Sequence, residues 1–194
     1  TGFYCSGKST AERYLKEDFG FYVIDMDKIG HKAHTLPEVK AEIAKQFGST
    51  MINPDGNVDR KKLGAAVFSD KKQLEKLNSL MRPFLLRLLK EDLELHKNEN
   101  IIISAALLFD AGLECFCEKI FIVRASLWRI FIRGWKRDRH SPLRVHRILR
   151  SQKLKEYINQ HAKTVDIVCI NTNGTPNRLR KRLLKVLKNE GIKR

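Results

Sequence analysis

The stretch TGFYCSGKST, from Thr1 to Thr10, decides how this chain is expected to fold. Residues Gly2 to Ser9 have the spacing G-x-x-x-x-G-K-S/T, which is typical of a loop whose backbone N–H groups wrap a phosphate. In such a loop the lysine reaches the outer phosphates and the hydroxyl binds Mg²⁺. The spacing therefore predicts a nucleotide-phosphate loop with Lys8 on the phosphates and Ser9 as the metal ligand. A surface turn with the same letters is the alternative.

The overall composition is that of one folded domain. The chain has 194 residues, 42% hydrophobic and 31% charged, so it can bury one ordinary core and is unlike a disordered chain. It contains no apolar run of the roughly 18 residues that cross a bilayer, and no signal peptide is visible. The four cysteines, Cys5, Cys115, Cys117 and Cys169, fit neither a zinc pattern nor a C-x-x-C pair. We expect reduced thiols in a cytoplasmic protein.

The net charge is strongly positive. There are 38 Lys and Arg against 22 Asp and Glu, which gives a formal charge of +16 at pH 7. A field of this sign favours anionic partners, whether nucleic acid, anionic lipid or phosphorylated small molecules. The charge alone does not choose among these partners, so the motifs must do so.

Four apolar runs, rich in Ile and Val and bounded by polar residues, predict buried strands of a parallel sheet. They are Tyr22–Asp25, Ile101–Phe109, Ile120–Val123 and Asp166–Ile170. A helix is expected from Thr10 to Asp18, so that its N-terminus faces the anion held by the loop. Because a phosphate loop is normally fed by a strand, we expect about five apolar residues before Thr1 in the intact protein, completing a five-stranded sheet. The predicted fold is thus an α/β phosphate-loop core.

The segment between the first two strands has helical periodicity. Helices are predicted at Val39–Phe47, Lys71–Leu80 and Phe84–Leu95, with a turn at Asn53–Gly56. Such an insert is the usual place for a substrate-binding subdomain. The predicted division is therefore a core of residues 1–27, 91–127 and 153–194, a helical acceptor domain of residues 28–90, and an arginine-rich lid of residues 128–152.

Two carboxylates, Asp25 and Asp27, lie at the end of the predicted strand Tyr22–Asp25. Ligands bind at the carboxyl ends of parallel strands, and an i, i+2 spacing places both side chains on one face while the strand lasts. One carboxylate can then take a proton from an acceptor hydroxyl while the other orients Mg²⁺ or water. The competing interpretation is an aspartate that caps the next helix.

The run WRIFIRGWKRDRH, residues 128–140, places Arg129, Arg133 and Arg137 four residues apart, on one face of a helix. Like charges at this spacing repel, which favours a face that meets an anion. In a phosphotransferase it would be a lid closing over the phosphoryl group. A nucleic-acid face, with Trp128 and Trp135 stacking on bases, and a solvated basic helix are the alternatives.

The C-terminal stretch RLRKRLLKVLKNEGIKR, residues 178–194, alternates Leu or Val with Lys or Arg. It predicts an amphipathic helix packed on the sheet, with a membrane-surface helix as the alternative.

Taken together, these motifs resemble the dephospho-CoA kinase family. The resemblance covers essentially the whole chain in order. It rests on the phosphate loop, V-I-D-x-D at residues 23–27, D-G-x-x-D-R at residues 55–60, L-N-x-x-x-x-P at residues 77–83, L-L-F-D at residues 107–110, the lid residues Arg133, Arg137 and Gln152, and the closing region from Asp166 to Gly174.

The resemblance implies ATP-dependent phosphorylation of the ribose 3′-hydroxyl of dephospho-CoA, the last step of coenzyme A synthesis. It implies ATP and Mg²⁺ as cofactors and a small-molecule substrate, with no nucleic acid or membrane, in a monomer or weak homo-oligomer. Asp27 would be the general base, Lys8 and Arg133 further catalytic residues, and Asp25, Arg82 and Arg137 substrate contacts. The ATP phosphates would be surrounded by Cys5, Ser6, Gly7, Lys8, Ser9 and Thr10.

The chain departs from the family pattern at several positions. Phe3 and Cys5 stand where glycines, which tolerate positive φ, are common. Arg82 replaces the usual His before Pro83, Ala106 a usual Pro and Asp110 a usual Glu. Another phosphate-loop small-molecule kinase, a basic nucleic-acid-binding protein and an inactive relative therefore remain the alternatives.

Overall fold

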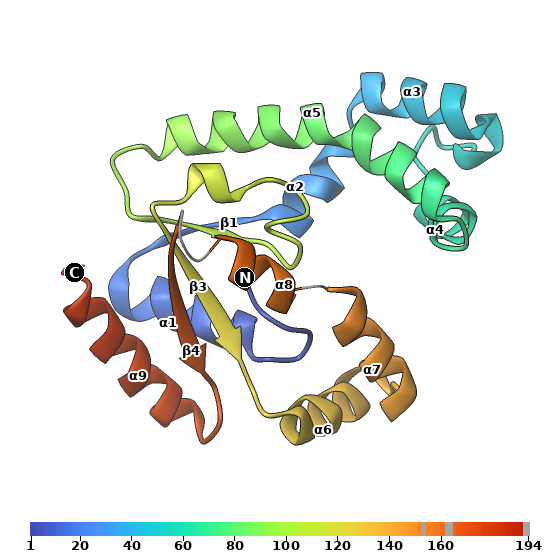
Figure 1. Ribbon diagram of the computed structural model, residues 1–194. Helices are drawn as coiled ribbons and strands as arrows, with labels where there is room; N and C mark the ends of the chain where they lie inside the picture. Colours follow the sequence, from blue (N-terminus) through green and yellow to red (C-terminus); the bar gives the residue numbers. More distant parts are fainter. Residues whose placement is uncertain (153, 162–164, 192–194) are drawn as a thin grey trace. The chain divides into compact units, whose positions relative to one another are not determined.

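A computed structural model describes residues 1–152, 154–161 and 165–191 (Figure 1). The chain forms two compact units. The first unit comprises Thr1–Val23 and Ile102–Arg194, and the second comprises Ile24–Ile101. The predicted division into core, acceptor domain and lid stays a prediction.

The described residues contain four strands in two pairs. β1 (Tyr22–Asp25) is the neighbour of β2 (Ile101–Ser104), and β3 (Lys119–Arg124) is the neighbour of β4 (Asp166–Asn171). β3 and β4 run parallel, with Lys119 opposite Asp166 at one end and Arg124 opposite Asn171 at the other. The prediction of parallel pairing is confirmed for β3 and β4, and the bounds of β1 match the predicted run.

β2 is shorter than predicted. The apolar run continues to Phe109, but the strand ends at Ser104. Beyond it the backbone turns on itself, because Ala111 donates to the carbonyl of Leu107 and Leu113 donates to that of Leu108. These local bonds replace a ladder, while Leu108 stays buried at 2% exposure. The predicted end of this strand was therefore wrong.

The first three residues pair with Val123 of β3. Val123 donates to the carbonyl of Thr1, Phe3 donates to that of Val123, and Gly2 forms a parallel bridge with Val123. A Cβ atom on Gly2 would lie 2.7 Å from the Val123 carbonyl oxygen, so glycine is required for this approach. Only an isolated bridge at Gly2 joins these first residues to β3, and the single five-stranded sheet stays a prediction.

The helices of the first unit build its core. They are α1 (Lys8–Phe19), the short η2 (Glu114–Phe116), α6 (Leu127–Asp138), α7 (Pro142–Ser151), α8 (Leu154–His161) and α9 (Pro176–Asn189). α1 and α9 lie side by side (Figure 1) and share one apolar cluster with β3 and β4. Leu179, Leu183 and Leu187 of α9 recur every four residues and are buried, which confirms the predicted amphipathic helix.

The second unit is helical apart from its strand ends and a single bridge between Ile52 and Val58. It contains α2 (Met26–Ala33), α3 (Pro37–Phe47), η1 (Ser49–Met51), α4 (Arg60–Phe68) and α5 (Lys71–Leu95). The predicted turn at Asn53–Gly56 is confirmed, since Gly56 has φ of 76° and donates to the carbonyl of Asn53.

The two helices predicted on either side of Pro83 are one helix, α5. A proline inside a helix removes one hydrogen bond and costs about 3 kcal/mol or more. Here Pro83 is exposed, while Leu80 before it and Leu88 and Leu89 after it are buried. α5 packs on α2, α3 and α4, and this packing on both sides of the proline explains why the helix continues. The predicted break was wrong.

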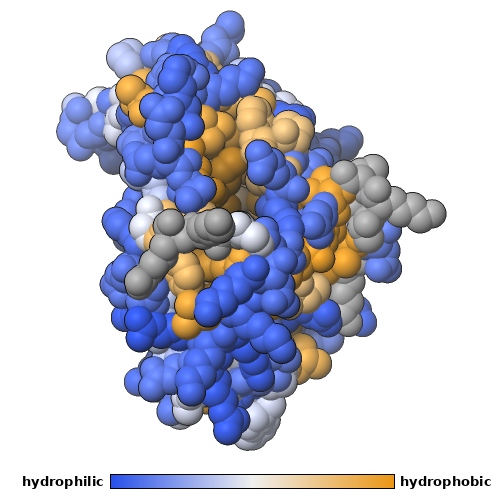
Figure 2. Space-filling model, turned by 90° about the vertical axis from the view of Figure 1, so that its left-hand side faces the viewer, coloured by the Kyte–Doolittle hydropathy of each residue, from blue (hydrophilic) through white to orange (hydrophobic). Residues whose placement is uncertain are grey.

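The face seen in Figure 2 is mostly hydrophilic. In the described part of the chain, no helix combines the length and apolarity that a membrane crossing demands. All four cysteines are free thiols.

Candidate nucleotide-binding site

The loop before α1 leaves several backbone donors unused. Gly7, at φ 100°, is the N-cap of α1, and its carbonyl accepts from the N–H groups of Thr10 and Ala11 at 3.1 Å each. No side chain caps this helix, and its first turn contains no acidic residue. Within the described residues the N–H groups of Gly7, Lys8 and Ser9 have no hydrogen-bond partner. These free donors and the helix dipole together favour an anion at this point.

The backbone of Cys5 is strained, as expected for a residue with a side chain at a position where glycine is common. Its φ is 51°, in the left-handed region that L-residues with side chains seldom adopt. Among the described residues that are not glycine, only Arg139 shares a positive φ. Phe3, the other replacement, has no such backbone angle. The loop thus holds Cys5 in a backbone conformation that glycine adopts without strain.

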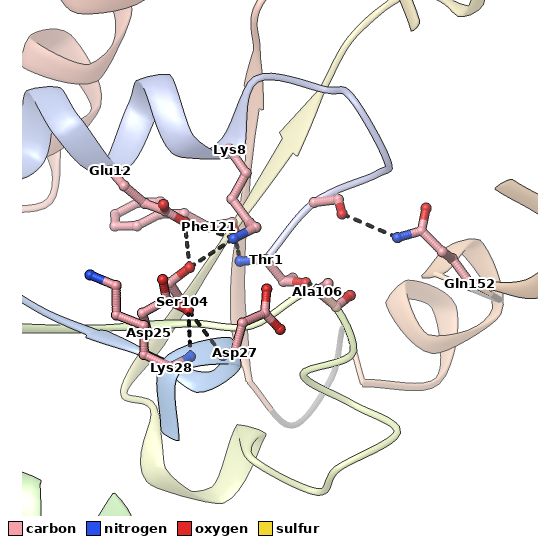
Figure 3. A network of polar contacts seen from close by, with 11 residues as sticks. Thr1, Lys8, Glu12, Asp25, Asp27, Lys28, Ser104, Ala106, Phe121 and Gln152 are labelled. Carbon is pink, nitrogen blue, oxygen red and sulfur yellow. Dashed lines mark hydrogen bonds and ion pairs between the residues drawn. The ribbon is translucent and has the colours of Figure 1, made fainter. Parts of the chain in front are cut away.

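Lys8 is held inside a small polar network (Figure 3). Its Nζ donates to Glu12 Oε1 at 2.9 Å and to Ser104 Oγ at 2.8 Å. The Ser104 hydroxyl in turn donates to the same Glu12 oxygen. Ser104 is the last residue of β2 and is 4% exposed. The side chain of Lys8 therefore lies beside the end of a strand, at the start of α1.

Ser9 and Thr10 follow in the first turn of α1, and Ser9 is exposed. A hydroxyl in this place can bind a cation that arrives with phosphate oxygens. In the described ranges no group of three or more His, Cys, Asp or Glu side chains could hold a metal ion. The Ser9 hydroxyl is a neutral oxygen donor of the kind that Mg²⁺ accepts as a ligand.

Arg133 of α6 contacts the backbone of the loop. Its Nη1 donates to the carbonyls of Ser6 at 3.0 Å and Cys5 at 3.2 Å, and to Thr172 Oγ1 at 3.3 Å, while its Nη2 donates to the Thr172 carbonyl at 3.4 Å. Burial and the neighbouring charge of Arg129 lower the pKa of Arg133. Two loop carbonyls and two oxygens of Thr172 therefore accept hydrogen bonds from this guanidinium.

Gln152 and Thr172 hold the same loop from other elements. Gln152 Oε1 accepts from the Tyr4 N–H at 2.9 Å, and its amide donates to the Gly2 carbonyl at 3.5 Å. The Thr172 hydroxyl donates to the Ser6 carbonyl. The loop is consequently fixed by side chains more than 120 residues away in the chain.

A second contact joins the loop to α6. The Tyr4 hydroxyl donates to the Asp138 carboxylate, which also receives both arms of Arg137 at 2.9 and 2.8 Å. The Arg137 guanidinium lies 5.3 Å from the centre of the Tyr4 ring, and His140 stacks on that ring. Hydrogen bonds from Arg137 and then Tyr4 lower the pKa of Asp138 to about 2. Arg137 thus has a carboxylate partner in this structure.

In the second unit, Asp25 caps a helix. Its Oδ1 accepts from the N–H groups of Asp27 at 2.9 Å and Lys28 at 3.4 Å (Figure 3). The strand ends at Asp25, and Asp27 lies in the first turn of α2, where it is exposed. The strand does not last to Asp27, so the expectation of one shared strand face is not met, and the competing interpretation of a helix-capping aspartate is confirmed for Asp25. Arg82, on α5, is exposed.

The chain is similar to dephospho-CoA kinases over most of its length. The family model for dephospho-CoA kinase matches residues 1–177. The chain belongs to the dephospho-CoA kinase family. The dephospho-CoA kinase of Fusobacterium nucleatum is 35% identical over 181 residues, which are 93% of this chain and 92% of that protein. The dephospho-CoA kinase of Dehalococcoides mccartyi is 35% identical over 176 residues, 89% of this chain and 86% of that protein.

Solved structures show the same fold for this dephospho-CoA kinase family member. A crystal structure of a Thermus thermophilus protein has a TM-score of 0.80 at 28% identity, covering 98% of this chain and 94% of that one. The dephospho-CoA kinase of Campylobacter jejuni has a TM-score of 0.61 at 23% identity, covering 97% of this chain and 94% of that one, and is similar in fold. The predicted α/β class is confirmed.

Several residues that surround the loop of this dephospho-CoA kinase family member were not predicted from the sequence. Glu12, Ser104 and Thr172 contact the loop or its lysine, yet none was singled out. For Glu12 a signal existed, since it lies four residues after Lys8 and so on the same helix face. For Ser104 and Thr172 the only signal was a small polar residue at or just after a strand end, which is common in any chain.

Proposed function

We propose that this protein transfers the γ-phosphoryl group of ATP to the ribose 3′-hydroxyl of dephospho-CoA, which gives coenzyme A in the last step of its synthesis. The observation that carries the proposal is the family match over residues 1–177 together with the loop at the start of α1. The unused N–H groups of Gly7, Lys8 and Ser9 suit the phosphates of a nucleotide, and Lys8 adds a positive charge.

In this proposal the loop binds and orients ATP. The residues around the phosphates are Cys5, Ser6, Gly7, Lys8, Ser9 and Thr10. Lys8 contacts the outer phosphates, and the Ser9 hydroxyl holds Mg²⁺ together with phosphate oxygens. The metal, when bound, neutralises negative charge on the phosphates. Since phosphoryl transfer needs little covalent chemistry from the protein, positioning and charge are what these residues contribute.

Asp27 is the proposed general base that takes the proton of the 3′-hydroxyl. Support comes from its place in the V-I-D-x-D motif and from its exposed side chain. Asp25 fixes the start of α2 and thereby the position of Asp27. Arg82 and Arg137 are proposed contacts to the charged groups of the acceptor, residues 28–90 its binding domain, and residues 128–152 a lid bearing the catalytic Arg133.

The test is ADP release from ATP and Mg²⁺ with dephospho-CoA, compared with AMP, CMP and adenosine as acceptors. Release that depends on dephospho-CoA, and that is lost in the folded Lys8→Ala variant, is the expected result. Release with AMP or CMP instead would assign another phosphate-loop kinase. No release with any acceptor, from a protein that binds MgATP, would overturn the proposed function.

A further inference from the structure

The ion pair of Lys8 and Glu12 is poorly suited to stabilising α1. A lysine in the first turn opposes the helix dipole, and the order Lys then Glu at i, i+4 is the weaker of the two orders. Yet both side chains are mostly buried, at 23% and 20% exposure. This ion pair adds little to the stability of α1, yet it is kept partly out of water. We therefore expect its role to lie at the loop.

The contacts of this pair form a closed triangle with Ser104 (Figure 3). Glu12 Oε1 accepts from both the Lys8 ammonium and the Ser104 hydroxyl, and that hydroxyl accepts from the same ammonium. Each hydroxyl and carboxylate atom in the triangle thus has a defined donor or acceptor role. A flexible lysine is fixed by two bonds that come from different elements, α1 and the end of β2.

Within this triangle Lys8 keeps one unused hydrogen-bond donor. An ammonium group has three donors, and two are used by Glu12 and Ser104. No partner within the described residues takes the third. Because the other two bonds fix the direction of the group, the third N–H has a set orientation.

We propose that Glu12, together with Ser104, is a positioning residue for Lys8: the pair holds the ammonium group in one orientation and leaves one donor for the nucleotide phosphates. This inference rests on the proposed function. Glu12 also offsets the charge of Lys8, so it adds little to the attraction that first binds the nucleotide. Its contribution lies in the orientation of Lys8 during transfer, where a small misplacement costs up to about a hundredfold in rate.

The experiment compares Glu12→Ala and Ser104→Ala with a matched control, Glu17→Ala. Glu17 pairs with Arg13 at 4.0 Å on the same helix, also at i, i+4, but both side chains are exposed, at 62% and 58%. For Glu12→Ala we expect kcat to fall about ten- to hundredfold, while the Kd of MgATP stays equal or becomes tighter. The kcat of Ser104→Ala should also fall. The kcat and the MgATP Kd of Glu17→Ala should equal those of the wild type.

Glu12→Gln separates geometry from charge. Its amide oxygen can accept the same two hydrogen bonds without the negative charge. If orientation is what counts, this variant keeps kcat within about threefold and binds MgATP at least as tightly. Losses of kcat in Glu12→Gln as large as in Glu12→Ala would overturn positioning by hydrogen bonds.

A second readout follows Lys8 directly. The ¹H–¹⁵N signals of lysine ammonium groups are seen by NMR when the group is immobilised, and Lys8→Ala assigns the signal. We expect a Lys8 signal in the wild type that disappears in Glu12→Ala and persists in Glu17→Ala. Persistence in Glu12→Ala, or kcat within twofold of the wild type, would overturn the inference. This readout needs no turnover, so a failed proposed function and a failed inference remain distinguishable.

Discussion

Arg133→Ala tests how α6 acts on the loop before α1. In the structure the guanidinium donates to the carbonyls of Ser6 and Cys5 at 3.0 and 3.2 Å, and more weakly to Thr172 at 3.3 and 3.4 Å. A hydrogen bond contributes about 0.5–1.5 kcal/mol net, and more when one partner is charged. Counting the two shorter bonds at about 1 kcal/mol each gives a loss of about 2 kcal/mol.

This loss has two measurable consequences. For a chain of this size, 1 kcal/mol corresponds to about 2–4 °C in Tm, so Arg133→Ala should lower Tm by about 4–8 °C. If the loss falls on the shape of the loop, MgATP binding weakens by up to about thirtyfold, since about 1.4 kcal/mol is a factor of ten. Thermal unfolding and calorimetric titration with MgATP measure the two effects.

Arg129→Ala is the matched control. Arg129 lies one turn earlier on α6, is exposed, and makes one bond of 3.4 Å to the Gly174 carbonyl. It should change Tm by less than about 2 °C. The reasoning is refuted if Arg133→Ala keeps the wild-type Tm and MgATP affinity and loses only kcat, because Arg133 would then act on the phosphoryl group alone.

Three further changes test other parts of the molecule. Cys5→Gly removes about 1 kcal/mol of strain from the left-handed backbone conformation, and the flexibility of glycine offsets part of this gain. The Tm should therefore rise by about 2 °C, and a lower Tm would contradict this. Asp27→Asn should lower kcat by about a hundredfold or more and leave the MgATP affinity within about twofold of the wild type, as measured by turnover assays and by titration. Near-normal turnover would exclude Asp27 as the general base. Burial, then the charges of Arg60 and His31, lower the pKa of His34 below its ordinary 6.5, so the unfolded chain takes up the proton first and stability falls as the pH drops below 6.5. Denaturant unfolding at pH 7 and pH 5 should show this loss in the wild type and a smaller one in His34→Gln, and an equal loss in both contradicts it.

The sequence determined those features that short-range patterns encode. The phosphate loop, the helix after it and the bounds of β1 follow from a motif and a short apolar run. Leu179, Leu183 and Leu187 of α9 follow from helical periodicity. These features need only residues within a few turns of one another, because backbone geometry and the burial of one face depend on near neighbours.

The tertiary structure alone decided where the charged and polar ends of the side chains go. Lys8 meets Ser104 across 96 residues, and Arg133 meets the Ser6 carbonyl across 127. It also decided that α5 continues through Pro83, because packing on both sides outweighs one lost hydrogen bond. A hydroxyl or carbonyl partner so far along the chain has no local signature, since any small polar residue can fill that place once the fold brings it there.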